Sequence, residues 1–367
     1  MAKGSLQLWI VCGPLDLPET HIFAALAGKG ISVSIYHSED LLPEREALLR
    51  KAGIRLVRMK IRSRLDFPAA RFLHAELQRH PCDLIYAPLN RALATALQAV
   101  WGHPTIKVVG YRGTLGHLTR WDPSSWLTYF HPRLDHIVAV SDAVQDYLVN
   151  RIRIPGTKVT RIYKGHDPAW YDTPSTVPPP LPGDEKALTI CFTGRIRPVK
   201  GVGFLLDALR FLPHDLNIRL LLAGDLADKK VKARLDRHED PRVHYLGFRK
   251  DIPSILEKTD VFVMPTVERE GLARSVLEAM SRRIPCIVSD VGGLPELVLD
   301  DVTGFVVPPR NAKAIASAIE KLAADKTLRF RFGQAARERV QAVFHVNTAI
   351  ENFESLFSRL VSTSRRL

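Results

Sequence analysis

Cysteine is scarce in this chain, and long apolar runs are missing from it. Only 4 of the 367 residues are cysteine, and no two of them have the spacing of a zinc site or of a dense disulfide framework. No stretch of about 18 uncharged apolar residues occurs, so we expect no membrane-spanning helix. These absences favour a cytoplasmic protein without a metal, whose reduced thiols lie in its core. The cysteines are Cys12, Cys82, Cys191 and Cys286.

Acidic residues are also in the minority, with 39 Asp and Glu against 52 Lys and Arg and a net charge of +13. Such a charge permits a nucleic acid, an anionic membrane or an anionic substrate as partner. No zinc-finger spacing and no RNA-recognition signature occurs, so no nucleic acid is expected. Residues 51–64 alternate cations with apolar side chains, which predicts a strand with one wholly cationic face. We hypothesise peripheral docking on the inner face of a membrane, where each cation contributes about 1 kcal/mol.

Strand-like apolar runs alternate with helix-like segments along the whole chain. This alternation predicts an α/β fold with parallel sheets built from right-handed crossovers. In the N-terminal half, the predicted strands are 6–12, 32–36, 54–59, 83–87 and 105–110, and the predicted helices are 18–28, 40–52, 67–80 and 91–101.

A proline-rich stretch divides the chain into two parts. Five prolines fall between Asp172 and Lys186, a density that excludes a helix or a central strand. We therefore predict two Rossmann-like domains that face each other across a cleft. The predicted parts are an N-terminal domain (1–171), a linker (172–186), a C-terminal domain (187–345), and a final segment (346–367) with a helix over 348–361.

Two carboxylates, Glu270 and Glu278, are separated by seven residues. Glu270 follows an apolar strand over 261–265, and apolar residues recur at helical spacing from Leu272 onward. Glu270 is thus expected just before a helix N-terminus and Glu278 one to two turns inside the helix. The unpaired N–H groups there suit a phosphate, and carboxylates accept hydrogen bonds from sugar hydroxyls. The alternative is a purely structural pair, since acids are common near helix starts.

A second charged segment follows the strand predicted over 189–193. Gly194 and Arg195 open a turn that ends with Lys200 and Gly201 before a predicted helix. Ligands of α/β domains bind at the carboxyl ends of strands, and Arg and Lys are the usual phosphate-binding side chains. A solvated basic loop is the alternative interpretation.

Together these segments resemble the donor site of the family 4 glycosyltransferases of group 1, which are retaining enzymes with the glycosyltransferase B fold. The resemblance rests on Gly-Arg-x4-Lys-Gly at 194–201 and on Glu-x7-Glu at 270–278. The run Gly-Gly-Leu-Pro-Glu at 292–296 and then Gly304 follow in the family's order. The similarity is strong over 189–308 and weaker before that range. The resemblance implies that domain 1–171 binds the acceptor, that domain 187–345 binds the nucleotide sugar, and that the final segment, 346–367, crosses back to the first domain.

The resemblance implies a role for each matching residue. Arg195 and Lys200 would hold the diphosphate of a nucleotide sugar, Glu278 would bind the ribose hydroxyls, and Glu270 would contact the donor sugar. The implied donor is a UDP- or GDP-sugar, with no prosthetic group and no metal, because cationic side chains take the place of a metal ion. The further donor-binding residues are Gly194, Phe248 at the nucleobase, and Gly271, Leu272 and Ala273, whose amides would help to hold the phosphates.

The N-terminal half departs from the family pattern. The usual glycine pair after the first strand is absent, and Gly13-Pro14 stands in its place. Many members carry a histidine after the strand that here ends at Gly110, whereas this chain continues with residues 111–117. We include His117 among the catalytic candidates, together with Glu270, Arg195 and Lys200. An ordinary polar loop is the alternative for His117.

The implied activity is the transfer of a sugar from a nucleotide sugar to a hydroxyl acceptor with retention of anomeric configuration. The acceptor is expected to be a lipid-linked, lipopolysaccharide or other cell-envelope glycan. Two alternatives stay open, namely a nucleotide-sugar epimerase of the same fold and a non-catalytic basic binding protein. Analysis of the product would separate the transferase from the epimerase.

Overall fold

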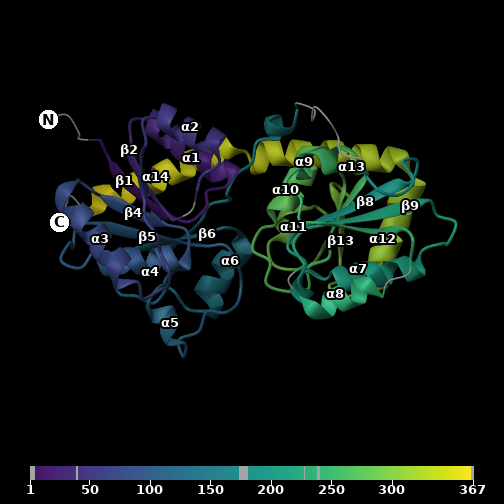
Figure 1. The fold of residues 1–367 in the computed structure, drawn as a ribbon, viewed down its shortest axis with the longest axis horizontal. Coiled ribbons are helices and arrows are strands. Elements are labelled where there is room, and N and C mark those ends of the chain that lie inside the picture. The colour runs from purple at the N-terminus through teal and green to yellow at the C-terminus, as the bar shows by residue number, and fades with distance from the viewer. Residues whose placement is uncertain (1–4, 39, 173–180, 227, 238–239, 365–367) are drawn as a thin grey trace. The chain divides into compact units, whose positions relative to one another are not determined.

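The chain forms two compact units, each with its own parallel sheet (Figure 1). The first unit contains residues 1–165 and 346–367, and the second contains residues 166–345. The computed structural model describes all residues except 1–4, 39, 173–180, 227, 238–239 and 365–367. Most of the predicted proline linker, including Pro174 and Pro178 to Pro180, therefore lies outside the described residues.

The first unit contains a seven-stranded sheet in the order β3-β2-β1-β4-β5-β6-β7. Every neighbouring pair of strands in it is parallel, as the alternation of strands and helices predicts. The central strands are buried on both faces, which explains why they are almost continuously apolar. The strands are β1 (Gln7–Cys12), β2 (Ser32–His37), β3 (Arg55–Arg58), β4 (Leu84–Ala87), β5 (Lys107–Arg112), β6 (His136–Ala139) and β7 (Val159–Arg161).

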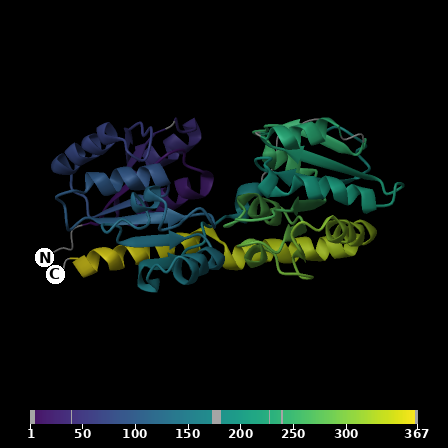
Figure 2. The ribbon, with the colours of Figure 1, turned by 90° about the horizontal axis from the view of Figure 1, so that it is seen from below.

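Helices cover both faces of this sheet (Figure 1). The C-terminal helix α14 (Val346–Ser364) packs on α1 (Leu17–Gly28), where Lys29 and Glu354 pair at 2.6 Å. Tyr86 of β4 contacts both Phe353 and Phe357 of α14, so the last segment of the chain completes the core of the first unit. Figure 2 shows the C-terminal helix, in yellow, along this unit. The other helices are α2 (Pro43–Lys51), α3 (Phe67–Arg79), α4 (Asn90–Ala99), α5 (Pro123–Trp126) and α6 (Asp142–Asp146), with a π-helical turn over Tyr147–Arg151.

The second unit contains a six-stranded parallel sheet in the order β10-β9-β8-β11-β12-β13. Two α/β segments run outward from β8 in opposite directions, so the order of the strands reverses there. Such a reversal places a crevice at the carboxyl ends of the strands on either side of it. The strands are β8 (Leu188–Thr193), β9 (Ile218–Ala223), β10 (Val243–Gly247), β11 (Val261–Met264), β12 (Cys286–Ser289) and β13 (Gly304–Val307).

Two groups of helices flank the second sheet. In Figure 1, α9, α10 and α13 lie on one side of the strands and α7 and α8 on the other. Helix α12 packs against α7, and α13 packs against α10. The helices are α7 (Val202–Ala208), α8 (Lys229–Asp236), α9 (Ile252–Glu257), α10 (Arg274–Ser281), α11 (Leu294–Leu297), α12 (Ala312–Ala324) and α13 (Lys326–Val343), with short 3₁₀ turns over Pro168–Tyr171, Pro198–Lys200 and Leu209–Phe211.

The α/β class with parallel sheets is confirmed, and the strand predicted over 54–59 is present as β3, but the wholly cationic strand face predicted for residues 51–64 is wrong. Strand β3 ends at Arg58, so Lys60 and Arg62 follow the strand instead of extending its cationic face. The chain turns there because the carboxylate of Asp66 accepts hydrogen bonds from the N–H groups of Arg62 and Ala69. Lys60 and Arg62 are nevertheless exposed, with buried Met59 and Ile61 between them.

Candidate functional site

Three consecutive strand ends in the second unit carry glycine. Gly194 follows β8, Gly224 follows β9, and Gly247 ends β10. The N–H of Gly194 donates to Ala223, and the N–H of Gly224 donates to Gly247. A Cβ added to Gly224 would lie 1.9 Å from the carbonyl oxygen of Gly194, so no other residue fits there. These three strand ends therefore carry no side chain at the place where α/β domains bind ligands.

The turn after β8 packs closely against the segment after β11. Gly201 has φ 69°, and a Cβ there would lie 1.9 Å from the carbonyl oxygen of Pro265. The N–H of Val267 donates to the carbonyl of Val199 at 2.8 Å. The glycine that closes the Gly-Arg-x4-Lys-Gly motif is thus required by the close approach of two backbones.

This approach brings Lys200 and Glu270 together. Their side chains pair at 2.5 Å, and the hydroxyl of Thr266 donates to the same carboxylate oxygen at 3.1 Å. The N–H of Gly293 donates to the backbone carbonyl of Glu270 at 3.2 Å. Glu270 is mostly buried and Lys200 partly so, so the pair holds both side chains in place at the edge of the sheet.

The helix after Glu270 begins slightly later than predicted. Helix α10 starts at Arg274, with Ala273 as N-cap, whereas the apolar pattern predicted helical spacing from Leu272. Gly271, Leu272 and Ala273 therefore precede the first turn, and the hydrogen bonds of the helix do not use their N–H groups. The predicted role of these amides does not require them to be helical.

Glu278 lies in the second turn of α10. Its carboxylate pairs with Arg274 at 3.2 Å and is about one-fifth exposed. Burial and the nearby charge of Glu278 raise the pKa of Tyr171 above its usual value. The described structure therefore gives Glu278 and Glu270 different cationic partners, Arg274 and Lys200.

Two of the predicted donor-binding side chains are exposed. In the part of the chain that the structure describes, Arg195 makes no side-chain hydrogen bond or ion pair. Phe248 follows β10 with 70% of its surface exposed, beside Arg249, which forms a two-pronged ion pair with Asp251. Arg195 can thus turn towards an anion, and the ring of Phe248 offers a flat apolar face at the same edge of the sheet.

Sequence reasoning missed Thr193, the last residue of β8. Its hydroxyl is buried and has no hydrogen-bond partner among the described residues. A buried hydroxyl without a partner costs about 1–3 kcal/mol. Its position directly before Gly194 makes it a further candidate for ligand contact, and only the three-dimensional structure reveals it.

The predicted catalytic residues are divided between the units. His117 belongs to the first unit, where it is exposed with φ 54°, whereas Glu270, Arg195 and Lys200 belong to the second. The neighbouring Arg112 is buried, and it donates to the carbonyl of Thr114 at 2.8 Å and to that of Gly116. Arg112 therefore shapes the loop that carries His117.

A buried charge cluster in the first unit was also missed. Lys164 pairs with Asp16 at 2.6 Å and with Glu19 at 3.1 Å. The two carboxylates also form a capping box at the start of α1. Burial raises the pKa of Glu19. For Lys164, burial acts to lower the pKa, but the two nearby carboxylates outweigh it and raise the pKa of Lys164 above its usual value. The Asp-x-x-Glu spacing could have predicted the cap. It could not have predicted the pairing with Lys164, which lies 145 residues or more further along the chain.

An open cavity of about 630 Å³ lies beside the loop that carries His117, at the ends of β4 and β5. Among the described residues that line it, none is an Asp or Glu, and three are arginines. We call it the first-unit cavity. Its lining consists of Arg64, Pro88, Leu89, Asn90, Arg91, Tyr111, Arg112, Gly113, Thr114 and Tyr129.

Searches for metal sites and membrane spans within the described residues find neither. No group of three or more His, Cys, Asp or Glu side chains there is arranged to hold a metal ion. No helix of the described ranges has both the length and the apolar character to cross a bilayer.

Two protein-family models match the chain. The model of the "Glycosyl transferases group 1" covers residues 177–339, and that of "Glycosyltransferase Family 4" covers residues 20–170. Between them they span most of both units. The chain belongs to the group 1, family 4 glycosyltransferases.

Curated relatives and a solved structure agree with this assignment. The chain is 31% identical over 179 residues to the capsular polysaccharide biosynthesis glycosyltransferase CapM of Staphylococcus aureus. The matched region covers 48% of this chain and 47% of CapM. It is 28% identical over 174 residues to the Escherichia coli UDP-Gal:alpha-D-GlcNAc-diphosphoundecaprenol alpha-1,3-galactosyltransferase, which covers 46% of this chain and 44% of that enzyme. The chain thus matches about half the length of these relatives.

The whole fold matches that of Anabaena HepE, whose crystal structure contains UDP-glucose. The TM-score is 0.76 at 20% identity, over 96% of this chain and 99% of HepE. At this identity the similarity concerns the fold alone, and that fold is the glycosyltransferase B fold.

Proposed function

We propose that this protein is a retaining glycosyltransferase that moves a sugar from a nucleotide sugar to a hydroxyl acceptor. The observation that carries the proposal is the pairing of Lys200 with Glu270 at the carboxyl edge of the second sheet, with Glu278 about two turns further along. The donor would lie at this edge, as a UDP- or GDP-sugar. Anabaena HepE binds UDP-glucose, and the E. coli relative is named for UDP-Gal, which favours a UDP-sugar.

Each side chain then has a distinct task. Arg195 and Lys200 balance the negative charge that develops on the leaving diphosphate, and the N–H groups of residues 271–273 add to this effect. Because Glu270 already fixes the position of Lys200, little reorganisation is needed as the bond breaks. Glu278 accepts hydrogen bonds from the ribose hydroxyls, and Phe248 stacks on the nucleobase.

The reaction needs no metal in this scheme. The bond between the donor sugar and its phosphate oxygen breaks, and the acceptor hydroxyl attacks the same face of the sugar that the diphosphate leaves. A phosphate oxygen of the leaving group takes the proton of that hydroxyl. Stabilisation by cationic side chains in place of a metal predicts that a chelator leaves the rate unchanged.

The acceptor side is assigned to the first unit. The first-unit cavity, with three arginines and no acid among its described lining, suits an acceptor that carries negative charge. Both curated relatives act on envelope glycans by their names, a capsular polysaccharide and a diphosphoundecaprenol-linked sugar. We therefore propose a lipid-linked or other cell-envelope glycan as acceptor, with His117 beside it.

Contact with an anionic membrane surface would bring such an acceptor to the enzyme. Within residues 60–72 of the first unit, exposed cations and exposed large apolar side chains lie close together in sequence, a combination typical of interfacial segments. Flotation with anionic vesicles at low salt tests this part, and failure to bind would refute it. The residues concerned are Lys60, Arg62, Leu65, Phe67 and Phe72.

Product analysis tests the proposed reaction. The protein would be incubated with radiolabelled UDP- and GDP-sugars and a membrane lipid extract, with and without EDTA. We expect label in the lipid-linked fraction in both arms, with the anomeric configuration of the donor. Conversion of one nucleotide sugar into another would instead identify an epimerase, and label transfer abolished by EDTA would contradict the metal-free scheme.

A further inference from the structure

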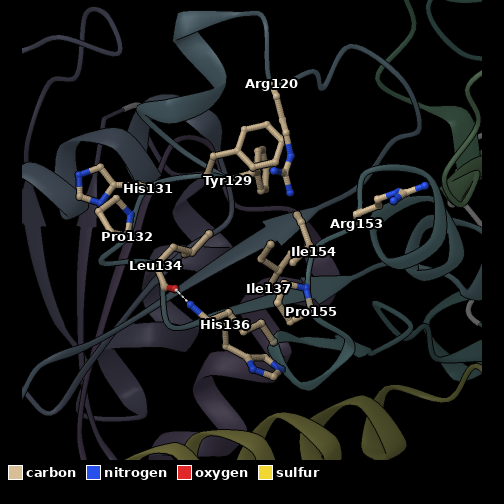
Figure 3. A pocket seen from close by; sticks show the side chains of 12 residues that line it. Arg120, Tyr129, His131, Pro132, Leu134, His136, Ile137, Arg153, Ile154 and Pro155 are labelled. Atoms are coloured by element: carbon tan, nitrogen blue, oxygen red, sulfur yellow. Dashed lines mark hydrogen bonds between the residues drawn. The ribbon is translucent and has the colours of Figure 1, made fainter.

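A second, smaller cavity lies in the first unit, outside every segment assigned above to the donor. Its volume is about 180 Å³, and its walls come from the segment before β6, from the start of β6 and from the loop before β7 (Figure 3). Tyr129 also lines the first-unit cavity, so the two cavities are neighbours. We call the smaller one the Arg153 cavity. Its lining consists of Arg120, Tyr129, Phe130, His131, Pro132, Leu134, His136, Ile137, Arg153, Ile154, Pro155 and Lys158.

The charge of the Arg153 cavity is uniformly positive. Its cations are Arg120, Arg153 and Lys158, and none of its described lining residues is acidic. Burial lowers the pKa of His136 to about 4, and burial also lowers that of His131, so neither histidine is charged at neutral pH. The positive charge therefore comes from the two arginines and the lysine.

Each of these three cations has N–H groups that donate to none of the described residues. In the described structure neither Arg120 nor Arg153 forms a side-chain hydrogen bond or an ion pair, and Arg120 lies over the ring of Phe130 at 5.6 Å. Lys158 donates once, to the carbonyl of Leu134 at 3.2 Å, so two of its three N–H groups remain. In Figure 3, Arg120 and Arg153 lie on different sides of the cavity.

Arg153 occupies a backbone position that favours glycine. Its φ is 61°, and the N–H of Ile154 donates back to the carbonyl of Leu148 at 3.0 Å, in the manner of a helix that ends in a left-handed residue. A side chain at such a position is destabilising. The chain thus keeps an arginine at the cavity where glycine would give a more stable fold.

Apolar side chains adjoin these cations. Ile137 and Ile154 line the cavity and are buried, and Trp126 packs on Phe130 while its indole N–H donates to the carbonyl of Arg120. Next to Arg120 in the sequence, Trp121 has 94% of its surface exposed. A ligand here meets cations and apolar surface together.

We propose that the Arg153 cavity binds the phosphate group of a ligand whose adjoining part is apolar. Phosphate is the anion that suits a cavity lined by two arginines and a lysine with no described acid, and the buried Ile137 and Ile154 of its wall suit an apolar substituent. Such a phosphate belongs either to a phospholipid headgroup or to a soluble phosphorylated metabolite. The site takes no part in the proposed donor binding, so it does not depend on the proposed function.

The test measures binding of two soluble probes, inorganic phosphate and short-chain dihexanoylphosphatidic acid, to the full chain by titration calorimetry. We expect saturable binding, with the lipid probe the tighter of the two. Arg153→Gly is expected to weaken binding about tenfold, the loss of one charge-assisted hydrogen bond, and to raise the melting temperature by roughly 2–4 °C. These opposite effects separate a binding role from a structural one.

Arg310→Gly is the matched control. Arg310 is an exposed arginine of the second unit with φ 59°, so its replacement removes the same charge and the same backbone strain elsewhere. It is expected to raise the melting temperature similarly and to leave probe binding unchanged. Equal loss of affinity in both variants would show that only the overall charge matters, and it would overturn the proposal.

Vesicles identify the source of the phosphate. If Arg153→Gly and Arg120→Gln weaken binding to phosphatidylglycerol vesicles as well as to the soluble probes, the ligand is a lipid headgroup. If they weaken only the soluble probes, it is a soluble phosphorylated molecule. Absence of saturable binding to both soluble probes would overturn the proposal. The proposed binding of a nucleotide sugar to the second unit would not be affected by that result.

Discussion

At the scale of single residues, the candidate donor site depends on one ion pair. Lys200 and Glu270 are 70 positions apart in the chain, yet their side-chain atoms lie 2.5 Å apart. The sequence predicted both residues through their motifs, because each motif has a local signature in glycine and in spacing. It could not predict that the two contact each other, nor that Thr266 donates to the same carboxylate, since these contacts depend on how the turn after β8 packs on the segment after β11.

Replacing Lys200 tests this pair. Lys200→Met is expected to lower kcat by about 10²–10³, the usual cost of losing one group that stabilises developing negative charge. The free energy of unfolding should fall by about 1–3 kcal/mol, because the mostly buried carboxylate of Glu270 loses its cation. Steady-state kinetics and urea unfolding measure the two quantities.

Lys29→Met is the matched control for this substitution. Lys29 also pairs with a glutamate, Glu354, at 2.6 Å, but it does so on the surface of the first unit. It should keep full activity. If both variants lost activity equally, or if Lys200→Met kept it, Lys200 would have no part in the chemistry.

At the scale of elements, glycines decide where helices and strands can approach. The pattern of apolar residues predicted strands such as β4 well, because a buried parallel strand is apolar throughout. It predicted boundaries less well. The predicted helix after Gly201 ends as an α-helix at Ala208 and continues as a 3₁₀ turn, and β3 stops at Arg58, before the turn in which Asp66 accepts a hydrogen bond from the N–H of Arg62.

A methyl group at Gly201 should disrupt the junction between β8 and α7. Gly201→Ala places a Cβ 1.9 Å from the carbonyl oxygen of Pro265 and forces alanine to φ 69°, so we expect a loss of about 2 kcal/mol or more. Gly203→Ala, two residues on inside α7, meets only the flexible side chain of Arg234 and should cost much less. Denaturant unfolding compares the two variants, and equal stability would contradict the close approach.

The cap of α3 predicts a pH effect on the acid side. Asp66 accepts hydrogen bonds from the N–H groups of Arg62 and Ala69, and these lower the pKa of its carboxyl group. A lowered folded pKa means that the stabilisation is complete above the unfolded pKa, about 3.9, and is lost as the pH falls through the folded value.

Asp66→Ala should therefore cost about 1 kcal/mol at pH 7 and progressively less below pH 4. Asp66→Asn keeps an acceptor and should remove the pH dependence of this contribution. Unfolding free energies measured from pH 2 to pH 7 decide the matter. A difference from wild type that stayed constant down to pH 2 would show that the charge of Asp66 has no role.

At the scale of the whole molecule, the two units differ in how the chain builds them. The second unit is continuous from residue 166 to residue 345, whereas the first requires α14 from the end of the chain. Tyr86, Phe353 and Phe357 form one buried aromatic group that joins this helix to β4. The sequence predicts the two α/β parts through the prolines between them, although residues 173–180 lie outside the described structure.

This difference predicts unequal fragments. A fragment of residues 166–345 should unfold cooperatively and retain nucleotide binding, because it contains the whole sheet from β8 to β13 and all the donor-binding candidates. A fragment of residues 1–165 lacks α14, exposes Tyr86 and should be destabilised or aggregate. Circular dichroism and thermal unfolding of the two fragments would show this, and a stable 1–165 fragment would contradict the role of α14.

The central claim is a nucleotide-sugar site at the carboxyl edge of the second sheet. The most direct test is thermal unfolding of the full chain with UDP, GDP, ADP and their common sugar conjugates, without added metal. A ligand at about 100 times its dissociation constant should add about 2.7 kcal/mol of stability. We predict a shift with one nucleotide, preserved in Lys29→Met and lost in Glu278→Ala and Arg195→Ala. No shift with any nucleotide, or a shift that survives both of the latter substitutions, would contradict the claim.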